Sequence, residues 1–119
     1  MSVSTETALV TKIVKAIKRL YPSAWTFKVV GHPYQESGVP DLLVCVDGLL
    51  IGMEVKHVKP RESEQHARER ATPKQRLHIK WINEAGGMAG VVTSVSDALE
   101  MIERARLKHG IIIEKINEE

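Results

Sequence analysis

Apolar residues recur at helical spacing over the segment from about Thr5 to Leu20. A period near 3.6 residues with one apolar face predicts an amphipathic helix. Ser4 or Thr5 can cap its start, and Tyr21-Pro22 ends it. The apolar stripe consists of Leu9, Val10, Ile13, Val14, Ile17 and Leu20. The basic side chains of the segment lie mostly off that stripe; they are Lys12, Lys15, Lys18 and Arg19.

Between residues 24 and 57 the apolar positions change to the shorter period of β-strands. The run "AWTFKVV" (24–30) predicts a strand, and the Gly- and Pro-containing stretch 31–40 predicts a loop. Two further runs, at about 41–46 and 49–57, are joined by Asp47-Gly48. Asp-Gly between alternating apolar runs is the strongest short-range signal for a two-residue hairpin turn. The sequence therefore predicts three consecutive strands, the last two of which form a hairpin.

A helix with clear start and stop signals is predicted over "TPKQRLHIKWINEAGG" (72–87). Thr72 is its N-cap, Pro73 takes the first helical position, Gln75 completes a capping box, and Gly86-Gly87 ends it. The preceding segment, 59–70, is highly charged with almost nothing apolar. That composition indicates an exposed loop or a marginal helix.

The C-terminal part predicts a strand and another helix. "MAGVVTS" has strand character, and Ser94 or Ser96 then caps a helix that runs to about Lys108 and ends at Gly110. The apolar run "IIIEKI" (111–116) fits either an edge strand or a continuation of the helix. The resulting order is α-β-β-β-α-β-α, with a last strand left open. This order predicts a mixed sheet with helices packed on it, an α/β sandwich.

Composition places the chain among ordinary globular proteins. A length of 119 residues suits one domain spanning 1–119, and 43% apolar with 27% charged residues argues against disorder. Aromatic residues make up 4%, which gives poor support for a base-stacking platform. The single cysteine, Cys45, lies in an apolar run, as expected of a small buried hydrophobe. The start "MSVSTETALV" lacks the features of a signal peptide, and no apolar run reaches membrane-spanning length, so we expect a soluble cytoplasmic protein.

Charge is distributed unevenly along the chain. The net charge is +2, but residues 1–40 carry five basic and two acidic side chains, a balance of +3. A basic N-terminal part is compatible with a polyanionic partner such as DNA. A solvated helix face explains the same charges without any partner.

The predicted hairpin turn fixes which residues face each other. If Asp47 and Gly48 form the turn, the numbers of each cross-strand pair sum to ~95, so that Asp41 lies opposite Glu54. Because side chains alternate along a strand, Lys56 projects from the same face as Glu54. Two acids and an ammonium group are therefore expected together on one side of the hairpin.

This cluster is typical of a site for phosphodiester hydrolysis. Opposed carboxylates ~5 Å apart repel each other, and a divalent cation such as Mg²⁺ would compensate that repulsion. The neighbouring ammonium can stabilise charge on a phosphate or lower the pKa of a water molecule. The alternative is that Asp41 caps a turn after Pro40, while Glu54 and Lys56 form a surface ion pair on an edge strand.

At these residues the sequence resembles the PD-(D/E)XK nuclease superfamily. "PD" at 40–41 and "EVK" at 54–56 supply its signature. The fuller pattern of "SGVPDLL", "GMEVK", "TPKQ", "GG" and "VVTS" is similar to the VRR-NUC family, the virus-type replication-repair nucleases, over about residues 6–103. The resemblance implies a restriction-endonuclease-like α/β sandwich and is compatible with a phage origin.

The resemblance also implies roles for individual residues. Asp41 and Glu54 would bind the catalytic Mg²⁺ or Mn²⁺ with help from the backbone carbonyl of Val55, and Lys56 would position or activate the attacking water. Gln75 matches a helix glutamine beside the active site, although the capping box alone explains it.

Glu6 matches an acid on the first helix that is a further catalytic and metal-ligand candidate. It continues the apolar stripe, where a carboxylate needs a partner or a metal. The alternative is a first-turn acid favoured by the helix dipole.

We therefore expect a Mg²⁺- or Mn²⁺-dependent endonuclease that cuts branched DNA, such as a four-way (Holliday) junction, in replication or repair. A homodimer would place two sites about a twofold axis. The candidate DNA-contacting residues are Lys12, Lys15, Lys59, Arg61 and Lys74. A non-catalytic DNA-binding module on the same fold and a nuclease acting on RNA remain open as alternatives.

Overall fold

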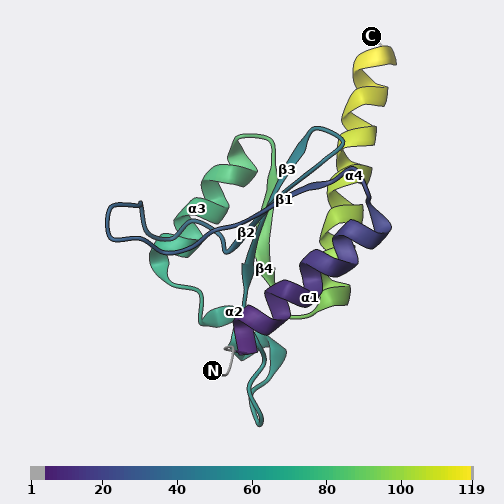
Figure 1. Ribbon diagram of the computed structural model, residues 1–119. Coiled ribbons are helices and arrows are strands. Elements are labelled where there is room, and N and C mark those ends of the chain that lie inside the picture. The colour runs from purple at the N-terminus through teal and green to yellow at the C-terminus, as the bar shows by residue number, and fades with distance from the viewer. Residues whose placement is uncertain (1–4, 119) are drawn as a thin grey trace.

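A sheet of four strands lies at the centre of the molecule, with helices on both faces (Figure 1). The computed structural model describes residues 5–118, and for residues 111–116 it describes the backbone only. The strands are β1 (Trp25–Lys28), β2 (Leu42–Val46), β3 (Leu49–Val55) and β4 (Met88–Val92). The helices are α1 (Thr5–Leu20), α2 (Glu64–Glu69), α3 (Pro73–Glu84) and α4 (Val95–Glu118). None of the described helices combines the length and the apolar character that a membrane crossing requires.

The strands lie in the order β1-β2-β3-β4, and only β3 and β4 run parallel. The predicted hairpin register is confirmed: Leu42 pairs with Met53, and Val46 pairs with Leu49. Asp47 and Gly48 have φ angles of 52° and 80°, as a type I′ turn requires. The parallel strand β4 follows β3 after a crossover that contains α2 and α3. The fold is thus the mixed α/β sandwich expected from the sequence.

The two faces of the sheet are covered unequally. On one face α1 and α4 enclose the main core, and α3 lies on the other face (Figure 1). The buried side chains of that core include Ile13, Ile17, Leu42, Val44, Ile51, Met53, Val55 and Ile102. On the second face α3 packs closely against the sheet. A Cβ added at Gly52 of β3 would lie only 3.0 Å from Cδ1 of Ile82 in α3. Glu54 points to this second face, since it alternates with the core residues Met53 and Val55.

The sheet ends earlier than the sequence predicts. β1 covers 25–28 rather than 24–30, and β3 stops at Val55 rather than at residue 57. The cause at β3 is local: the N–H of Val55 bonds to the side chain of Asp41 and no longer to a backbone carbonyl of β2. The edge of the hairpin is therefore closed by a carboxylate.

Two helical features differ from the expectation. The charged segment contains a short helix, α2, which is capped by Ser63 and anchored by the buried Ala67. The prediction that Gly110 ends the last helix is wrong, because α4 continues through it to Glu118. A glycine in a helix interior costs only about 1 kcal/mol, and no proline follows to force a stop. The run 111–116 thus continues the helix, and its side chains lie outside the described part.

Candidate active site

Asp41 lies where the chain enters β2, and two hydrogen bonds hold it there. Its Oδ2 accepts the N–H of Val55 at 2.9 Å, and its backbone carbonyl accepts the N–H of Val29 at 2.8 Å. Asp41 is thus tied to β3 on one side and to the residue that follows β1 on the other. The side-chain bond is therefore not the cap of a turn after Pro40 that the alternative foresees, because it reaches a residue of β3 that lies 14 positions further along the chain.

Glu54 is the only buried ionisable side chain in the described part of the chain, with 1% of its surface exposed. Its Oε1 lies 3.6 Å from Nζ of Lys56, whereas its buried Oε2 has no hydrogen-bond partner among the described residues. Burial raises the pKa of Glu54 to about 8, and the nearby charge of Asp41 adds to this rise, while Lys56 opposes it. The two carboxyl groups therefore lie close enough to disfavour simultaneous ionisation.

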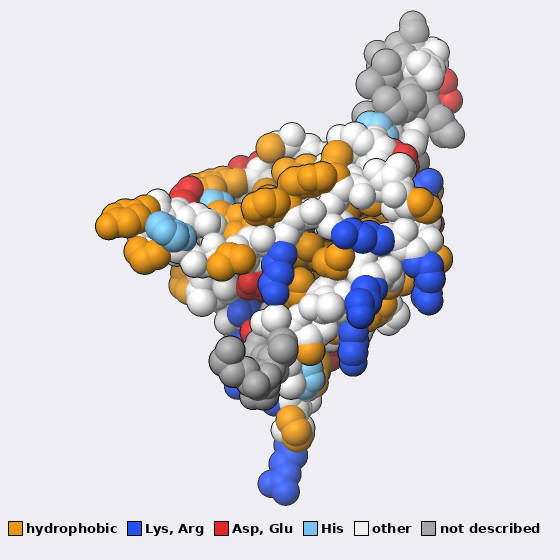
Figure 2. Space-filling model, in the orientation of Figure 1, with side chains coloured by type: hydrophobic (Ala, Val, Ile, Leu, Met, Phe, Trp, Pro, Cys, Tyr) orange, Lys and Arg blue, Asp and Glu red, His pale blue; other side chains and the backbone are white. Residues whose placement is uncertain are grey.

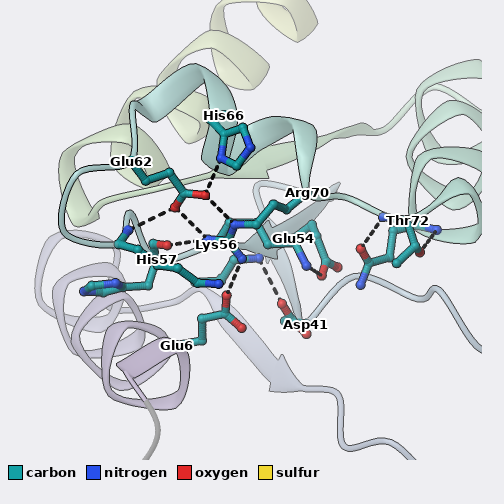
Figure 3. A network of polar contacts seen from close by, with 12 residues as sticks. Glu6, Asp41, Glu54, Lys56, His57, Glu62, His66, Arg70 and Thr72 are labelled. Atoms are coloured by element: carbon teal, nitrogen blue, oxygen red, sulfur yellow. Dashed lines mark hydrogen bonds and ion pairs between the residues drawn. The ribbon is translucent and has the colours of Figure 1, made fainter.

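Lys56 follows directly after β3, and its N–H donates to the carbonyl of Val92 in β4. Its side chain is 12% exposed and reaches back toward Glu54. Figure 3 shows Asp41, Glu54 and Lys56 gathered at this end of the sheet. The structure thus brings together the three groups that the hairpin register predicts. A surface ion pair on a solvated strand, the alternative for Glu54 and Lys56, does not describe a carboxylate that is almost completely buried.

Glu6 lies in the first turn of α1, near the three-residue cluster but outside it. Its Oε1 forms an ion pair with Nη1 of Arg70 at 3.5 Å (Figure 3). Glu6 and Asp41 line one surface pocket, together with Val10 and Lys28. Within the part of the chain that the structure describes, no group of three or more Asp, Glu, His or Cys side chains is arranged to hold a metal ion. Glu6 is therefore at the edge of the site and paired with a cation of the protein.

Gln75 occupies the position that its sequence motif predicts, at the start of α3. The side-chain Oε1 of Gln75 accepts the backbone N–H of Thr72 at 2.8 Å, and the backbone N–H of Gln75 donates to Oγ1 of Thr72 at 3.2 Å. The capping box is complete. The position of the Gln75 side chain is thus explained by the start of the helix, without a contact to Glu54 or Lys56.

The five candidate DNA-contacting residues are all exposed, and none makes an ion pair within residues 5–118. They are Lys12, Lys15, Lys59, Arg61 and Lys74. Lys12 and Lys15 share the exposed side of α1 with Lys18 and Arg19, and Figure 2 shows Lys and Arg side chains gathered over this helix. Lys59 and Arg61 lie in the loop before α2, and Lys74 lies in the first turn of α3. The structure therefore distributes the basic candidates over several surfaces rather than one.

Sequence reasoning missed the residues that hold this end of the sheet together. Arg70 and Glu62 form a forked ion pair, with Arg70 Nε 2.8 Å from Glu62 Oε2 and Nη2 3.2 Å from Oε1. Gly38, in the loop before Asp41, has a φ of 92° and packs against the backbone of Lys74. The glycine was visible in the motif "SGVPD", but its packing partner was not. The sequence of the segment 59–70 does not show which of its charged side chains form ion pairs with each other.

Known proteins resemble this chain in structure but not detectably in sequence. No protein-family model matches it, and no curated protein matches it. A solved structure described as "VRR_NUC domain protein" matches with a TM-score of 0.61 and 18% identity, over 88% of this chain and 90% of that chain. A second, described as "VRR_NUC domain", matches with a TM-score of 0.49 and 24% identity, over 78% of this chain and 92% of that chain. The first match shows that the chain has the fold of a VRR_NUC domain protein, and the resemblance seen in the sequence is confirmed at that level.

Proposed function

We propose that this protein is a metal-dependent nuclease that hydrolyses DNA phosphodiester bonds. The observation that carries the proposal is Glu54, a buried carboxylate that faces Asp41 and has an oxygen without a partner among residues 5–118. Lys56 contacts only the other oxygen, and a buried carboxylate oxygen without a partner is costly unless a further cation compensates it. The nuclease fold and the motif residues at 40–41 and 54–56 support the same conclusion.

The donor set fits a hard divalent cation. Asp41 and Glu54 supply carboxylate oxygens, which Mg²⁺ and Mn²⁺ prefer. The Val55 N–H bonds to Asp41, and the N–H and C=O of one strand residue point to the same side, so the Val55 carbonyl points to the side of β3 on which Asp41 lies. These three groups would hold the ion. When bound, the ion supplies Lewis acidity toward a phosphoryl oxygen and lowers the pKa of a coordinated water.

Lys56 has the role of positioning the water nucleophile. Its ammonium is mostly buried beside Glu54, so it carries a fixed positive charge where negative charge develops on the phosphate. The ammonium can also donate a hydrogen bond to the attacking water and hold it in line with the scissile bond. Glu54 keeps Lys56 in place through their 3.6 Å contact.

The exposed basic side of α1 gives the proposed enzyme a surface for the DNA backbone. Lys12 and Lys15 project from it, and the helix borders the pocket that Glu6 and Asp41 line. Exposed basic residues that lack internal partners are available for phosphate contacts. Phosphate contacts do not distinguish DNA from RNA. We propose DNA because the sequence resembles replication-repair nucleases.

We also propose that two copies associate through the uncovered part of the second sheet face. Cross-strand neighbours share a face, so the pairs Trp25–Cys45 and Phe27–Leu43 place these four side chains on the side of α3. Trp25, Phe27 and Leu50 stay 52%, 51% and 43% exposed, since α3 packs mainly on β3 and β4. This patch, Trp25, Phe27, Leu43, Cys45 and Leu50, contains no charged side chain, which is typical of the centre of a protein interface and unlike a DNA-binding surface. A twofold dimer would present two sites to a branched substrate.

The proposal is tested with labelled four-way junctions, flaps, nicked duplexes, single-stranded DNA and RNA. Purified protein should cleave branched or duplex DNA with Mg²⁺ or Mn²⁺ and stop when EDTA is added. Lys56→Ala should lower the cleavage rate at least about a hundredfold, as expected for loss of a group that stabilises the transition state. The exposed Lys80→Ala, which removes a lysine of α3 paired with Glu84, serves as the matched control.

Three results would each contradict part of this proposal. Salt-dependent binding of DNA without cleavage in any divalent metal would favour the non-catalytic binding module. Cleavage that Lys56→Ala leaves at the wild-type rate would remove the lysine from the mechanism. Cleavage of RNA alone would replace the substrate while keeping the site.

A further inference from the structure

The guanidinium of Arg70 is held firmly at the edge of the candidate active site. It makes the forked ion pair with Glu62, and its Nη2 also donates to the carbonyl of His57 at 2.6 Å. Glu62 is itself fixed, because it accepts the N–H of Lys59 and contacts Nδ1 of His66 at 2.7 Å. These bonds, those of Arg70 first, lower the pKa of Glu62 to about 2, so the fork stays charged near neutral pH. Figure 3 shows the arrangement beside Lys56.

Glu6 is held much more loosely than Glu62. It contacts Arg70 through one pair of atoms at 3.5 Å, and its side chain is 43% exposed, whereas that of Glu62 is 7% exposed. Arg70 keeps its position through Glu62 and the His57 carbonyl whether or not Glu6 is present. Glu6 can therefore leave Arg70 by a change of its own rotamer, without disturbing the rest of the network.

The alternative destination of Glu6 is the acid pair across the pocket. Glu6 and Asp41 line the same pocket, yet Glu6 does not join Asp41 and Glu54 in a three-acid group among the described residues. We infer that Arg70 is a positioning residue that holds Glu6 away from the acid pair until a divalent cation competes for it. Arg70 and the cation are then rival partners of one carboxylate. This inference rests on the proposed metal site at Asp41 and Glu54.

The inference predicts a specific energetic coupling between Arg70 and Glu6. Removing Arg70 frees Glu6 for the cation, so Arg70→Gln should tighten Mn²⁺ binding. An ion pair as exposed as this one is worth at most about a fivefold change in affinity. If Glu6 is replaced as well, the gain should become smaller, because the freed carboxylate is absent. A general loss of positive charge near the site would act equally in both backgrounds.

A double-mutant cycle measures this coupling. Mn²⁺ is titrated calorimetrically into the wild-type protein, Arg70→Gln, Glu6→Gln and the double variant, at a pH where all four melt cooperatively. We expect Arg70→Gln to bind Mn²⁺ about two- to fivefold more tightly than the wild type, and the gain to shrink toward one in the Glu6→Gln background. Arg104→Gln removes an exposed arginine of α4 with no ion pair in the described residues and should leave the affinity unchanged.

Weaker Mn²⁺ binding by a folded Arg70→Gln, or the same change with and without Glu6, would overturn the inference while leaving the metal site intact. Absence of Mn²⁺ binding by the wild type would instead overturn the proposed function, and the inference with it. Should Arg70→Gln not fold, the wild type still decides the question. The carboxyl ¹³C signal of Glu6, assigned through Glu6→Gln, should move as Mg²⁺ is added, and a signal that stays in place contradicts the exchange.

Discussion

At the scale of single residues, Glu54 should make the stability of the metal-free protein depend on pH. Its pKa is about 8 in the folded protein, whereas the ordinary value is 4.5. Between these values the folded state keeps a proton that the unfolded state has released, so a rising pH favours unfolding. We expect the free energy of unfolding to fall by more than about 1.4 kcal/mol between pH 4.5 and 8, because a tenfold difference in proton affinity between the two states already corresponds to that amount.

The measurement is urea unfolding in EDTA across this pH range, for the wild type and for Glu54→Gln. The Gln variant should show a much flatter profile, since it cannot ionise. Glu100→Gln, an exposed position on α4, is the matched control and should keep the wild-type slope. A wild-type stability that rises from pH 5 to pH 8 would contradict the burial effect at Glu54.

Local sequence pattern predicts some site residues well and others not at all. The Asp47-Gly48 turn fixes the register of a hairpin, so the meeting of Asp41, Glu54 and Lys56 follows from counting residues. Arg70, Glu62 and the His57 carbonyl meet through the path of a charged loop, for which no short-range rule exists. Glu6 shows the same limit, because helical phase placed it toward the core but could not name Arg70 as its partner.

At the scale of elements, Gly38 fixes the loop that delivers Asp41 to the hairpin. A Cβ there would lie 2.7 Å from the backbone of Lys74, and the φ of 92° strains any other residue. We expect Gly38→Ala to destabilise the protein by about 2 kcal/mol or more. Gly31→Ala is the matched control in the same loop, because its Cβ would meet nothing within 4 Å, and it should cost less than about 0.5 kcal/mol.

Chemical denaturation of both glycine variants tests this expectation. Equal stabilities for the two would show that the loop does not depend on its contact with α3. A further consequence is that Gly38→Ala should weaken Mn²⁺ binding, since Asp41 follows the displaced loop by only three residues.

Elements were predictable where the signals were local. α1 covers the residues that the apolar stripe predicts, and the capping box at Thr72 gives the start of α3. The end of β3 was missed for a tertiary reason, and the end of α4 was missed because one glycine is a weak stop signal. β3 stops because the Asp41 side chain replaces a backbone hydrogen-bond partner of Val55. α4 continues through Gly110 because one glycine in a helix interior costs little free energy.

At the scale of the whole molecule, the uncovered sheet patch should control association. We expect the wild type to sediment as a dimer at micromolar concentration and the double variant Trp25→Ser, Phe27→Ser to sediment as a monomer. The stacked Trp25 and Phe27 rings, 5.7 Å apart, form the largest apolar part of the patch. Leu20→Ser, at a 53% exposed position on α1, should remain dimeric. A monomeric wild type would contradict the proposed dimer.

Asp41 and Glu54, which the hairpin register brings face to face, should bind a divalent cation between them. Calorimetric titration of Mn²⁺ at pH 7.5 measures this binding, with the wild type compared against Glu54→Gln and, as a surface control, Glu100→Gln. We expect saturable binding by the wild type and by Glu100→Gln, and at least about a tenfold loss of affinity in Glu54→Gln. A folded wild type that does not bind Mn²⁺, or a Glu54→Gln variant that binds it equally well, would show that the two acids do not form a metal site.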